Sequence, residues 1–249
     1  MTQGIVVLVH GYLDGPQVWR RLIDEPAPHG WDIVSVALPQ GTADAGSDRQ
    51  LEGYAADVVR QVELLAAVAQ APVVMIGHSM GAQVAELAAL NLRDRLAGLV
   101  LVTPAPLAGY ALPPAVMARF VDRAGMTDRE AIVAGKRALA VALDAGALDI
   151  LVDGTLATPR QDALAQLRAW TGGHPAGQAP SALRCAVLCV STDDTFITED
   201  LVAATAMRFS DARIEKVPRA GHWPQLEQPA ALADLLRRFI AALPPPSRA

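Results

Sequence analysis

A single serine lies at a sharp corner between an apolar run and an alanine-rich run. In the stretch VVMIGHSMGAQVAELAAL, residues 73–90, Gly77 and Gly81 stand two residues before and two residues after Ser79. A strand that turns directly into a helix forces its corner residue into a strained backbone conformation, and glycines on either side remove side chains that would collide there. The corner raises the serine hydroxyl above the sheet, at a helix N-terminus that favours developing negative charge. The pattern predicts a nucleophilic serine.

A nucleophilic serine needs a base, and the base needs a carboxylate that orients it. Two later loops supply these groups. The loop STDDTF, with Asp193 and Asp194, follows an expected strand over 183–192, and the loop RAGHWPQLEQP, with His222, follows an expected strand over 212–218. Nucleophile, acid and histidine in this chain order are typical of one hydrolase architecture. We therefore expect the serine, the histidine and one of the two acids to converge.

The same chemistry requires two N–H donors for the oxyanion that forms on the attacked carbonyl. The N–H of Met80, directly after the serine, is one candidate. The loop HGYLDG after the first expected strand offers the second, through the backbone of Tyr12. Gly11 would let this loop approach the substrate oxygen closely. The predicted oxyanion hole is therefore formed by Tyr12 and Met80.

The elements that must position these groups alternate between short apolar runs and longer helical patterns. The expected strands are 4–11, 31–39, 72–79, 96–104, 183–192 and 212–218. The expected helices between them are 51–70, 80–92, 198–208 and 229–242. Most of the strands have near-continuous hydrophobic centres, as strands covered on both faces do. The alternation predicts an α/β fold with a mostly parallel sheet and helices on both faces.

The alternation stops over residues 105–180, which contain no convincing strand. Helical patterns occur near 114–124, 128–144 and 158–170, and turn-rich segments stand at both ends. We interpret this stretch as a helical lid inserted over the sheet. The core is then expected to consist of residues 1–104 and 181–249.

With these motifs in place, the chain resembles the α/β-hydrolase fold family, in particular its lid-bearing serine esterases and lactonases. The matching positions are His10-Gly11, Gly77-His78-Ser79-Met80-Gly81, the acid after the expected strand 183–192, and Gly221-His222 followed by Glu227 and Pro229. Relatives commonly place the acid three residues after a glycine at the strand end. Here Ser191 stands in place of that glycine, so the resemblance implies Asp194, with Asp193 as its competitor. The extra N-terminal hairpin of many relatives is absent.

The resemblance implies a cofactor-free serine hydrolase that cleaves a carboxylic ester or lactone through an acyl-enzyme. In this interpretation Ser79 attacks, His222 is the base and Asp194 orients it. The same triad also serves C–C bond hydrolases, amidases, and acyl transferases or perhydrolases, which remain alternatives. A hydrolase-fold protein that only binds a ligand is a further alternative.

The substrate pocket is expected to be apolar. Tyr12, Met80 and Phe196 adjoin the catalytic loops and are candidates for its lining, and Trp223 either lines it or packs against the last helix. Further candidates from the lid region are Leu107, Tyr110, Met117, Phe120 and Trp170. The lid helices are rich in alanine, leucine and valine, which favours a small and largely apolar substrate.

The other histidines have simpler interpretations. His10 is expected to shape the oxyanion loop, and His78 is expected to pack below the serine. His29 and His174 lie in loops rich in glycine and proline, where solvation is the simplest expectation, although His174 stands at the lid's exit and is a possible substrate contact. No histidine pair has metal-ligand spacing, so we predict no metal site. No P-loop or dinucleotide fingerprint occurs either, so no cofactor is expected.

Composition narrows the partners. Hydrophobic residues make up 52% of the 249 residues and the net charge is −5, which argues against disorder and against a nucleic-acid partner. No apolar run approaches the length that spans a bilayer. Cys185 and Cys189 would lie about 13 Å apart on one face of a strand, too far for a disulfide. We therefore expect a cytoplasmic protein that binds a small molecule and neither membrane nor nucleic acid.

Overall fold

The computed structural model describes residues 3–40, 49–66, 71–92 and 95–244. Within these residues six strands form one sheet in the order β2-β1-β3-β4-β5-β6, and every neighbouring pair is parallel. The strands are β1 (Gly4–Val9), β2 (Trp31–Val36), β3 (Val73–His78), β4 (Leu96–Val102), β5 (Ala186–Ser191) and β6 (Ala212–Lys216). The predicted parallel sheet is confirmed, and each strand ends one to three residues before the end of its expected range.

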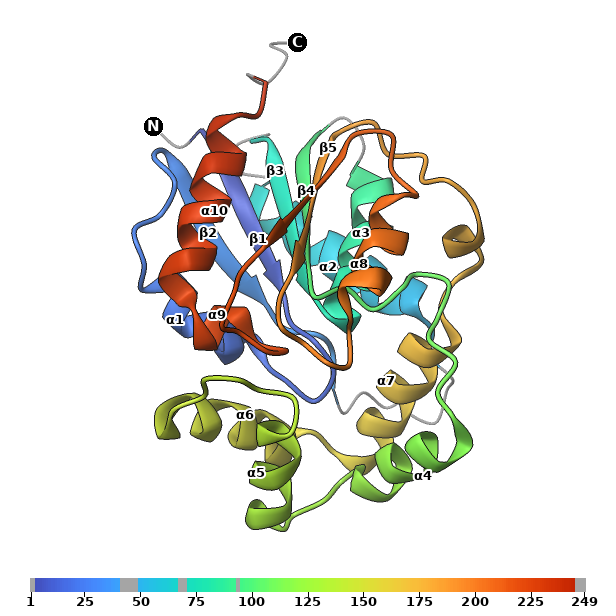
Figure 1. Cartoon of the computed structure of the whole chain (residues 1–249). Helices are drawn as coiled ribbons and strands as arrows, with labels where there is room; N and C mark the ends of the chain where they lie inside the picture. The colour runs from blue at the N-terminus through green and yellow to red at the C-terminus, as the bar shows by residue number, and fades with distance from the viewer. Residues whose placement is uncertain (1–2, 41–48, 67–70, 93–94, 245–249) are drawn as a thin grey trace.

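Helices cover both faces of the sheet (Figure 1). One face carries α2 (Leu51–Ala66), α3 (Met80–Leu92) and α8 (Glu199–Ala206). The other face carries a 3-10 turn, η1 (Pro16–Trp19), with α1 (Arg20–Ile23), α9 (Pro224–Glu227) and α10 (Pro229–Ala241). The four longer helices of these two sets were expected from the sequence, and they occur where the helical spacing predicts them, except that residues 67–70 of the expected helix 51–70 lie outside the described residues.

Two hydrophobic cores result, because successive residues of a strand point to opposite faces. In β1, Val7 and Val9 belong to the core under α2, α3 and α8, whereas Val6 and Leu8 belong to the core under α1 and α10. All four side chains are almost fully buried. A strand covered on both faces needs apolar residues at every position, which explains the unbroken run in β1.

Between β4 and β5 the chain forms four helices, α4 (Pro114–Arg123), α5 (Arg129–Arg137), α6 (Ala145–Ala157) and α7 (Arg160–Gly172), followed by a 3-10 turn, η3 (Pro175–Gln178). The four helices α4–α7 gather at one end of the sheet, at the bottom of Figure 1. Residues from α4, α5 and α7 line a cavity together with residues that follow β1 and β3. The four helices, termed here the α4–α7 segment, therefore cover the carboxyl ends of the strands.

The helical pattern over 128–144 is helical only in its first part, because residues 138–144 contain no helix, and α6 lies outside the predicted patterns. Helix α5 ends at Arg137, and Asp144 caps the separate helix α6, accepting a hydrogen bond of 2.9 Å from the N–H of Ala147. An aspartate at this position satisfies one of the free N–H groups of the first turn and favours a new helix start.

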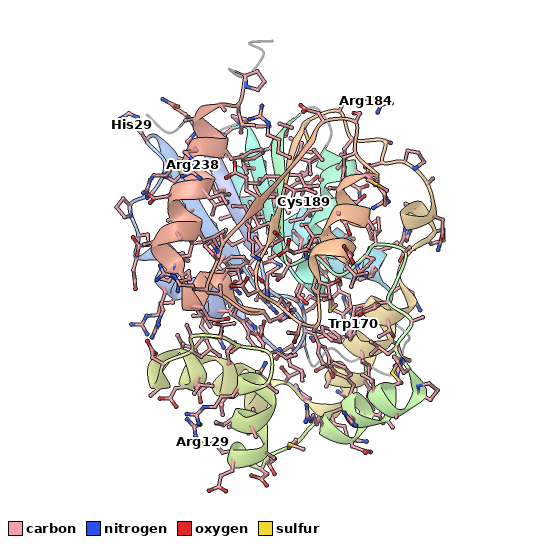
Figure 2. The ribbon with its side chains drawn as sticks, in the orientation of Figure 1. His29, Arg129, Trp170, Arg184, Cys189 and Arg238 are labelled. Carbon is pink, nitrogen blue, oxygen red and sulfur yellow. The ribbon has the colours of Figure 1, made fainter. Side chains whose placement is uncertain are left out.

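The described residues contain no helix long and apolar enough to cross a bilayer. Figure 2 shows the side chains that fill the layers, with Cys189 inside the sheet and His29 near the edge of the molecule. Both cysteines are free; Cys189 is buried within β5 and Cys185 precedes that strand.

Candidate active site

The corner at Ser79 has the strained geometry that its neighbours suggest. Ser79 joins β3 to α3 with a φ of 53°, a left-handed conformation that costs a non-glycine residue about 1–2 kcal/mol. A Cβ on Gly77 would lie 2.2 Å from the carbonyl oxygen of Gly81, and one on Gly81 would lie 2.4 Å from the carbonyl oxygen of His10. Both glycines are therefore required by the close approach of helix, strand and loop.

The ring of His222 faces the serine. Its Nε2 lies 3.1 Å from the Oγ of Ser79. The backbone of this histidine is fixed on both sides, because its N–H donates to the carbonyl oxygen of Leu139 at 2.8 Å. Its own carbonyl oxygen accepts from Nε2 of His78 at 2.7 Å and from the hydroxyl of Thr103 at 3.2 Å. The ring is therefore held at the serine by a rigid loop.

Asp194 lies on the far side of the same ring. Its Oδ2 is 2.6 Å from Nδ1 of His222, and its Oδ1 accepts from the N–H of Phe196 at 2.8 Å. Burial by itself raises the pKa of this carboxyl group. The charge of His222 and the hydrogen bonds from His222, Phe196 and Ile197 outweigh burial and leave the pKa below its ordinary value. Asp194 is therefore ionised and placed to hold the Nδ1–H tautomer.

Asp193 faces away from the histidine. Its side chain is 41% exposed, its Oδ1 lies 2.8 Å from Nζ of Lys216, and its Oδ2 accepts from the N–H of Arg219 at 2.8 Å. The hydrogen bond from Lys216 and then the one from Arg219 lower the pKa of Asp193. This carboxylate ties two neighbouring surface loops together and does not contact His222.

The N–H groups of Tyr12 and Met80 have no hydrogen-bond partner within the described part of the chain. Leu13, the residue after Tyr12, adopts a φ of 56°, and its N–H donates to Oε1 of Gln166 in α7 at 3.2 Å. A Cβ on Gly11 would lie 2.9 Å from Nδ1 of His78, so only glycine fits there. The loop after β1 is thus bent toward the serine and fixed from the α4–α7 segment.

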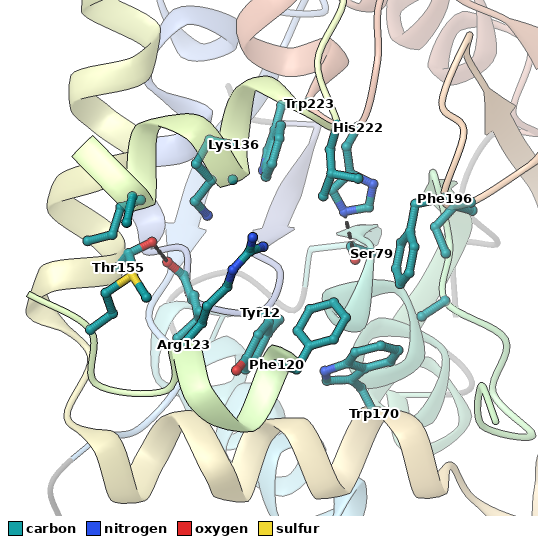
Figure 3. Close-up of a pocket in the computed structure, with 18 residues that line it drawn as sticks. Tyr12, Ser79, Phe120, Arg123, Lys136, Thr155, Trp170, Phe196, His222 and Trp223 are labelled. Atoms are coloured by element: carbon teal, nitrogen blue, oxygen red, sulfur yellow. Dashed lines mark hydrogen bonds between the residues drawn. The ribbon is translucent and has the colours of Figure 1, made fainter. Parts of the chain in front are cut away.

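Ser79 and His222 open into a cavity of about 100 Å³ (Figure 3). Tyr12, Phe120, Trp170 and Phe196 supply aromatic rings to its wall, with neighbouring ring centroids 5.4–6.4 Å apart in the group that also includes Tyr110. The remaining lining residues are Leu13, Ala105, Arg123, Met126, Ala131, Ile132, Gly135, Lys136, Leu139, Thr155, Ile197 and Trp223. Most of this wall is apolar.

The proposed lining residues fall into two groups. Tyr12, Phe196 and Trp223 line the cavity, as do Phe120 and Trp170. Leu107, Tyr110, Met117 and the side chain of Met80 belong to the adjoining hydrophobic core instead. The sequence pattern does not separate these two groups, because a helical stripe of apolar residues looks the same whether it faces a core or a cavity.

A buried ion pair lies beside the cavity. Nζ of Lys136, in α5, is 3.3 Å from Oδ1 of Asp14, whose side chain is 2% exposed. The indole N–H of Trp223 donates to Oδ2 of Asp14 at 3.1 Å, and Nζ of Lys136 lies 4.9 Å from the indole centroid. Burial raises the pKa of Asp14, but the charges of Lys136 and two histidines and the indole hydrogen bond reverse this and lower it.

The four other histidines make no contact with the serine hydroxyl. His10 is buried, donates from Nδ1 to the carbonyl oxygen of Gly11 at 3.0 Å and accepts at Nε2 from Leu38, so it shapes the loop after β1. His78 is fully buried, and desolvation followed by the charge of His222 lowers its pKa to about 3. His174 pairs with Glu52 and does not line the cavity, and His29 is exposed.

The model of the alpha/beta hydrolase family matches residues 6–235. The chain belongs to the alpha/beta hydrolase family. No curated protein is significantly similar in sequence to this alpha/beta hydrolase.

Solved structures of the same fold include two esterases. A thermophilic esterase from Thermogutta terrifontis, with malate bound, is 23% identical and has a TM-score of 0.76, with 96% of this chain and 90% of that chain covered. An esterase from Exiguobacterium antarcticum is 15% identical with a TM-score of 0.83, and the coverage is 97% and 93%. Est816, described as an N-acyl homoserine lactone degrading enzyme, is 18% identical with a TM-score of 0.75 and coverage of 95% and 93%. At identities this low, the structural similarity establishes the fold alone.

One residue of this hydrolase has a role that the sequence suggests only faintly. Glu227 is buried, and its Oε1 accepts from the N–H groups of Gly221 and Trp223 at 3.0 and 3.2 Å. Its Oε2 accepts from Val141 and Ala142 at 2.7 and 2.8 Å. This carboxylate joins the loop of His222 to the α4–α7 segment. The available signal is an acid five residues after the histidine, at the end of a short helix that starts at proline.

Proposed function

We propose that this alpha/beta hydrolase is a serine hydrolase that cleaves a carboxylic ester or lactone of a small, largely apolar substrate. The observation that carries the proposal is the pair of contacts made by His222. One ring nitrogen lies 3.1 Å from Oγ of Ser79 and the other lies 2.6 Å from Oδ2 of Asp194. A base and its orienting acid in this geometry are what serine acyl transfer requires.

In the proposed mechanism, His222 takes the proton of Ser79 as the hydroxyl oxygen attacks the carbonyl carbon. Asp194 keeps the base in the right tautomer and stabilises the imidazolium that forms. The oxyanion accepts hydrogen bonds from the N–H groups of Tyr12 and Met80, at the start of α3 where the helix dipole adds to the effect.

The tetrahedral intermediate collapses when His222 gives the proton to the leaving alcohol and the C–O bond of the ester breaks. The acyl group then remains on Ser79. Water enters, loses a proton to the same imidazole and attacks the acyl carbon, and the second collapse releases the acid and restores the serine hydroxyl. No cofactor enters this sequence.

The cavity supports the substrate class in size and polarity. Its volume of about 100 Å³ suits a small substrate, and its wall is mainly aromatic and aliphatic. We further propose that residues 105–180 act as the lid of residues 1–104 and 181–249. Because Phe120 and Trp170 come from this stretch, the lid would define one side of the substrate pocket.

The test is the Ser79→Ala variant with a nitrophenyl ester of a short acid. We expect kcat to fall by about four orders of magnitude or more, since the nucleophile and its base act as a unit. The matched control is Ser210→Ala, at an exposed serine after α8, which should keep wild-type turnover. Near-wild-type activity of purified Ser79→Ala protein would refute the assignment.

Two further measurements separate the alternatives. A fluorophosphonate should label wild-type protein at Ser79; a protein that only binds ligand would stay unlabelled. The second measurement compares kcat/KM across the reactions that the same triad can catalyse. The panel contains short and long esters, lactones, amides, a substrate of C–C hydrolases, and hydrogen peroxide as an acyl acceptor. The proposal requires the ester or lactone to give the highest kcat/KM.

A further inference from the structure

The cavity wall has an unusual distribution of charge. Its lining residues include two cations, Arg123 and Lys136, and no carboxylate. The chain as a whole has a net charge of −5, so this local excess of positive groups is not a consequence of composition. We therefore ask, for each of the two cations, which neighbouring groups balance its charge.

The charge of Lys136 is already balanced. Nζ lies 3.3 Å from Asp14 and over the ring of Trp223, as described above. A buried ammonium with a carboxylate and an indole face as neighbours has little unbalanced charge to offer a ligand.

Arg123 is different, because no acidic group pairs with its guanidinium among the described residues. It is the last residue of α4, it is exposed, and its side chain reaches across to α5. There it lies against Gly135, where a Cβ would be 3.2 Å from Nη1. A glycine inside a helix costs about 1 kcal/mol relative to alanine, and here it leaves room for the guanidinium at the cavity.

The two ends of the cavity differ in character. Figure 3 shows Arg123 and Lys136 on one side of Ser79 and Phe196 on the other. His222 lies between them, with the ring of Phe196 at 6.3 Å and the ring of Trp223, next to Lys136, at 5.0 Å. A substrate carbonyl at Ser79 would therefore have an aromatic wall at one end and the guanidinium at the other.

We propose that the substrate carries a carboxylate, which Arg123 binds, on the part of the molecule opposite its apolar end. This inference rests on the proposed ester or lactone hydrolysis and names its substrate class more closely: a small ester with one anionic end. A guanidinium matches a carboxylate with two parallel hydrogen bonds, and Arg123 has no acidic partner among the described residues that would compete for them. The aromatic end takes the apolar part.

The experiment compares kcat/KM for two pairs of esters, because either the acid part or the alcohol part can extend toward Arg123. One pair is methyl hydrogen glutarate and methyl hexanoate; the other is 4-acetoxybutanoate and pentyl acetate. In at least one pair the wild-type protein should have the higher kcat/KM for the anionic ester. Arg123→Gln should lower kcat/KM about tenfold for that ester alone, and the loss is no larger because the guanidinium is partly exposed to solvent. For the neutral esters, kcat/KM of Arg123→Gln should stay within about twofold of the wild-type value, because the rest of the cavity is unchanged.

The matched control is Arg119→Gln, one turn earlier on α4 at an exposed arginine outside the cavity wall, which should behave as wild type. Glutarate binding by calorimetry gives a readout that does not depend on turnover, and Arg123→Gln should weaken it about tenfold relative to wild type. If the wild-type protein hydrolyses no ester of either pair but binds glutarate as predicted, the proposed function is refuted and the anion site is still supported. Unchanged charge preference and unchanged glutarate binding in Arg123→Gln would overturn the anion site.

Discussion

The buried pair between Asp14 and Lys136 offers a quantitative test of how the α4–α7 segment is held to the sheet. Lys136 comes from α5, whereas Asp14 lies in the loop after β1. We consider Lys136→Met, which keeps the length and much of the volume of the side chain but removes its charge. The variant leaves the carboxylate of Asp14 in place, 2% exposed, without its cation.

Removing one partner of a buried ion pair typically costs about 3 to 5 kcal/mol in the free energy of unfolding. Asp14 keeps the hydrogen bond from the indole of Trp223 at 3.1 Å and can take up a proton, so we expect the lower end, about 3 kcal/mol. The double variant Asp14→Asn/Lys136→Met should be more stable than Lys136→Met alone, with a coupling energy of about 2 kcal/mol.

The assay is urea denaturation followed by circular dichroism, with the unfolding slope compared among variants. Lys216→Met is the matched control, because Lys216 also contacts two carboxylates, at 2.8 and 2.5 Å, but its side chain is 40% exposed. Solvent screens such a pair, so this control should differ little from wild type. Equal stability of Lys136→Met and Lys216→Met, or additive effects of the two substitutions in the double variant, would refute the stabilising role of the buried pair.

Two further predictions concern the acid beside His222. Asp194→Asn should lower kcat about ten-thousandfold, because the amide favours the wrong tautomer of the base, whereas Asp193→Asn should stay within a few-fold in the same ester assay; equal losses would contradict the geometry. The low pKa of Asp194 also makes its ionised form stabilising above the ordinary value of 3.8, and this contribution is lost as the pH falls through the folded-state pKa. The difference in unfolding free energy between wild type and Asp194→Asn, measured from about pH 5 to pH 3, should therefore shrink as the pH falls; a difference independent of pH would exclude this contribution.

The sheet and the position of the serine could be predicted because each depends on short-range rules. An unbroken apolar run such as β1 indicates a strand covered on both faces, and glycines on either side of Ser79 indicate a tight corner. The order of serine, acid and histidine then follows from the succession of loops. The structure places Ser79, His222 and Asp194 within hydrogen-bonding distance, at the strand ends that this order implies.

The rest depends on contacts between residues far apart in the sequence. The choice between Asp193 and Asp194 is made by backbone direction in a loop, where one side chain reaches Lys216 and the other reaches His222. The pairing of Asp14 with Lys136 joins residues that have no common motif. Such pairs form only once the sheet and the α4–α7 segment have packed, so no local sequence pattern predicts them.

Strands β4 and β5 are hydrogen-bonded neighbours although residues 103–185 separate them along the chain. The entropy of closing a loop rises only with the logarithm of its length, and doubling the length costs about 0.6 kcal/mol. The ladder that begins with Gly98 opposite Ala186 would therefore survive large insertions or deletions between the two strands. The sheet therefore tolerates changes of length in this stretch, provided that the contacts of Lys136 with Asp14 and of residues 141 and 142 with Glu227 are kept or replaced.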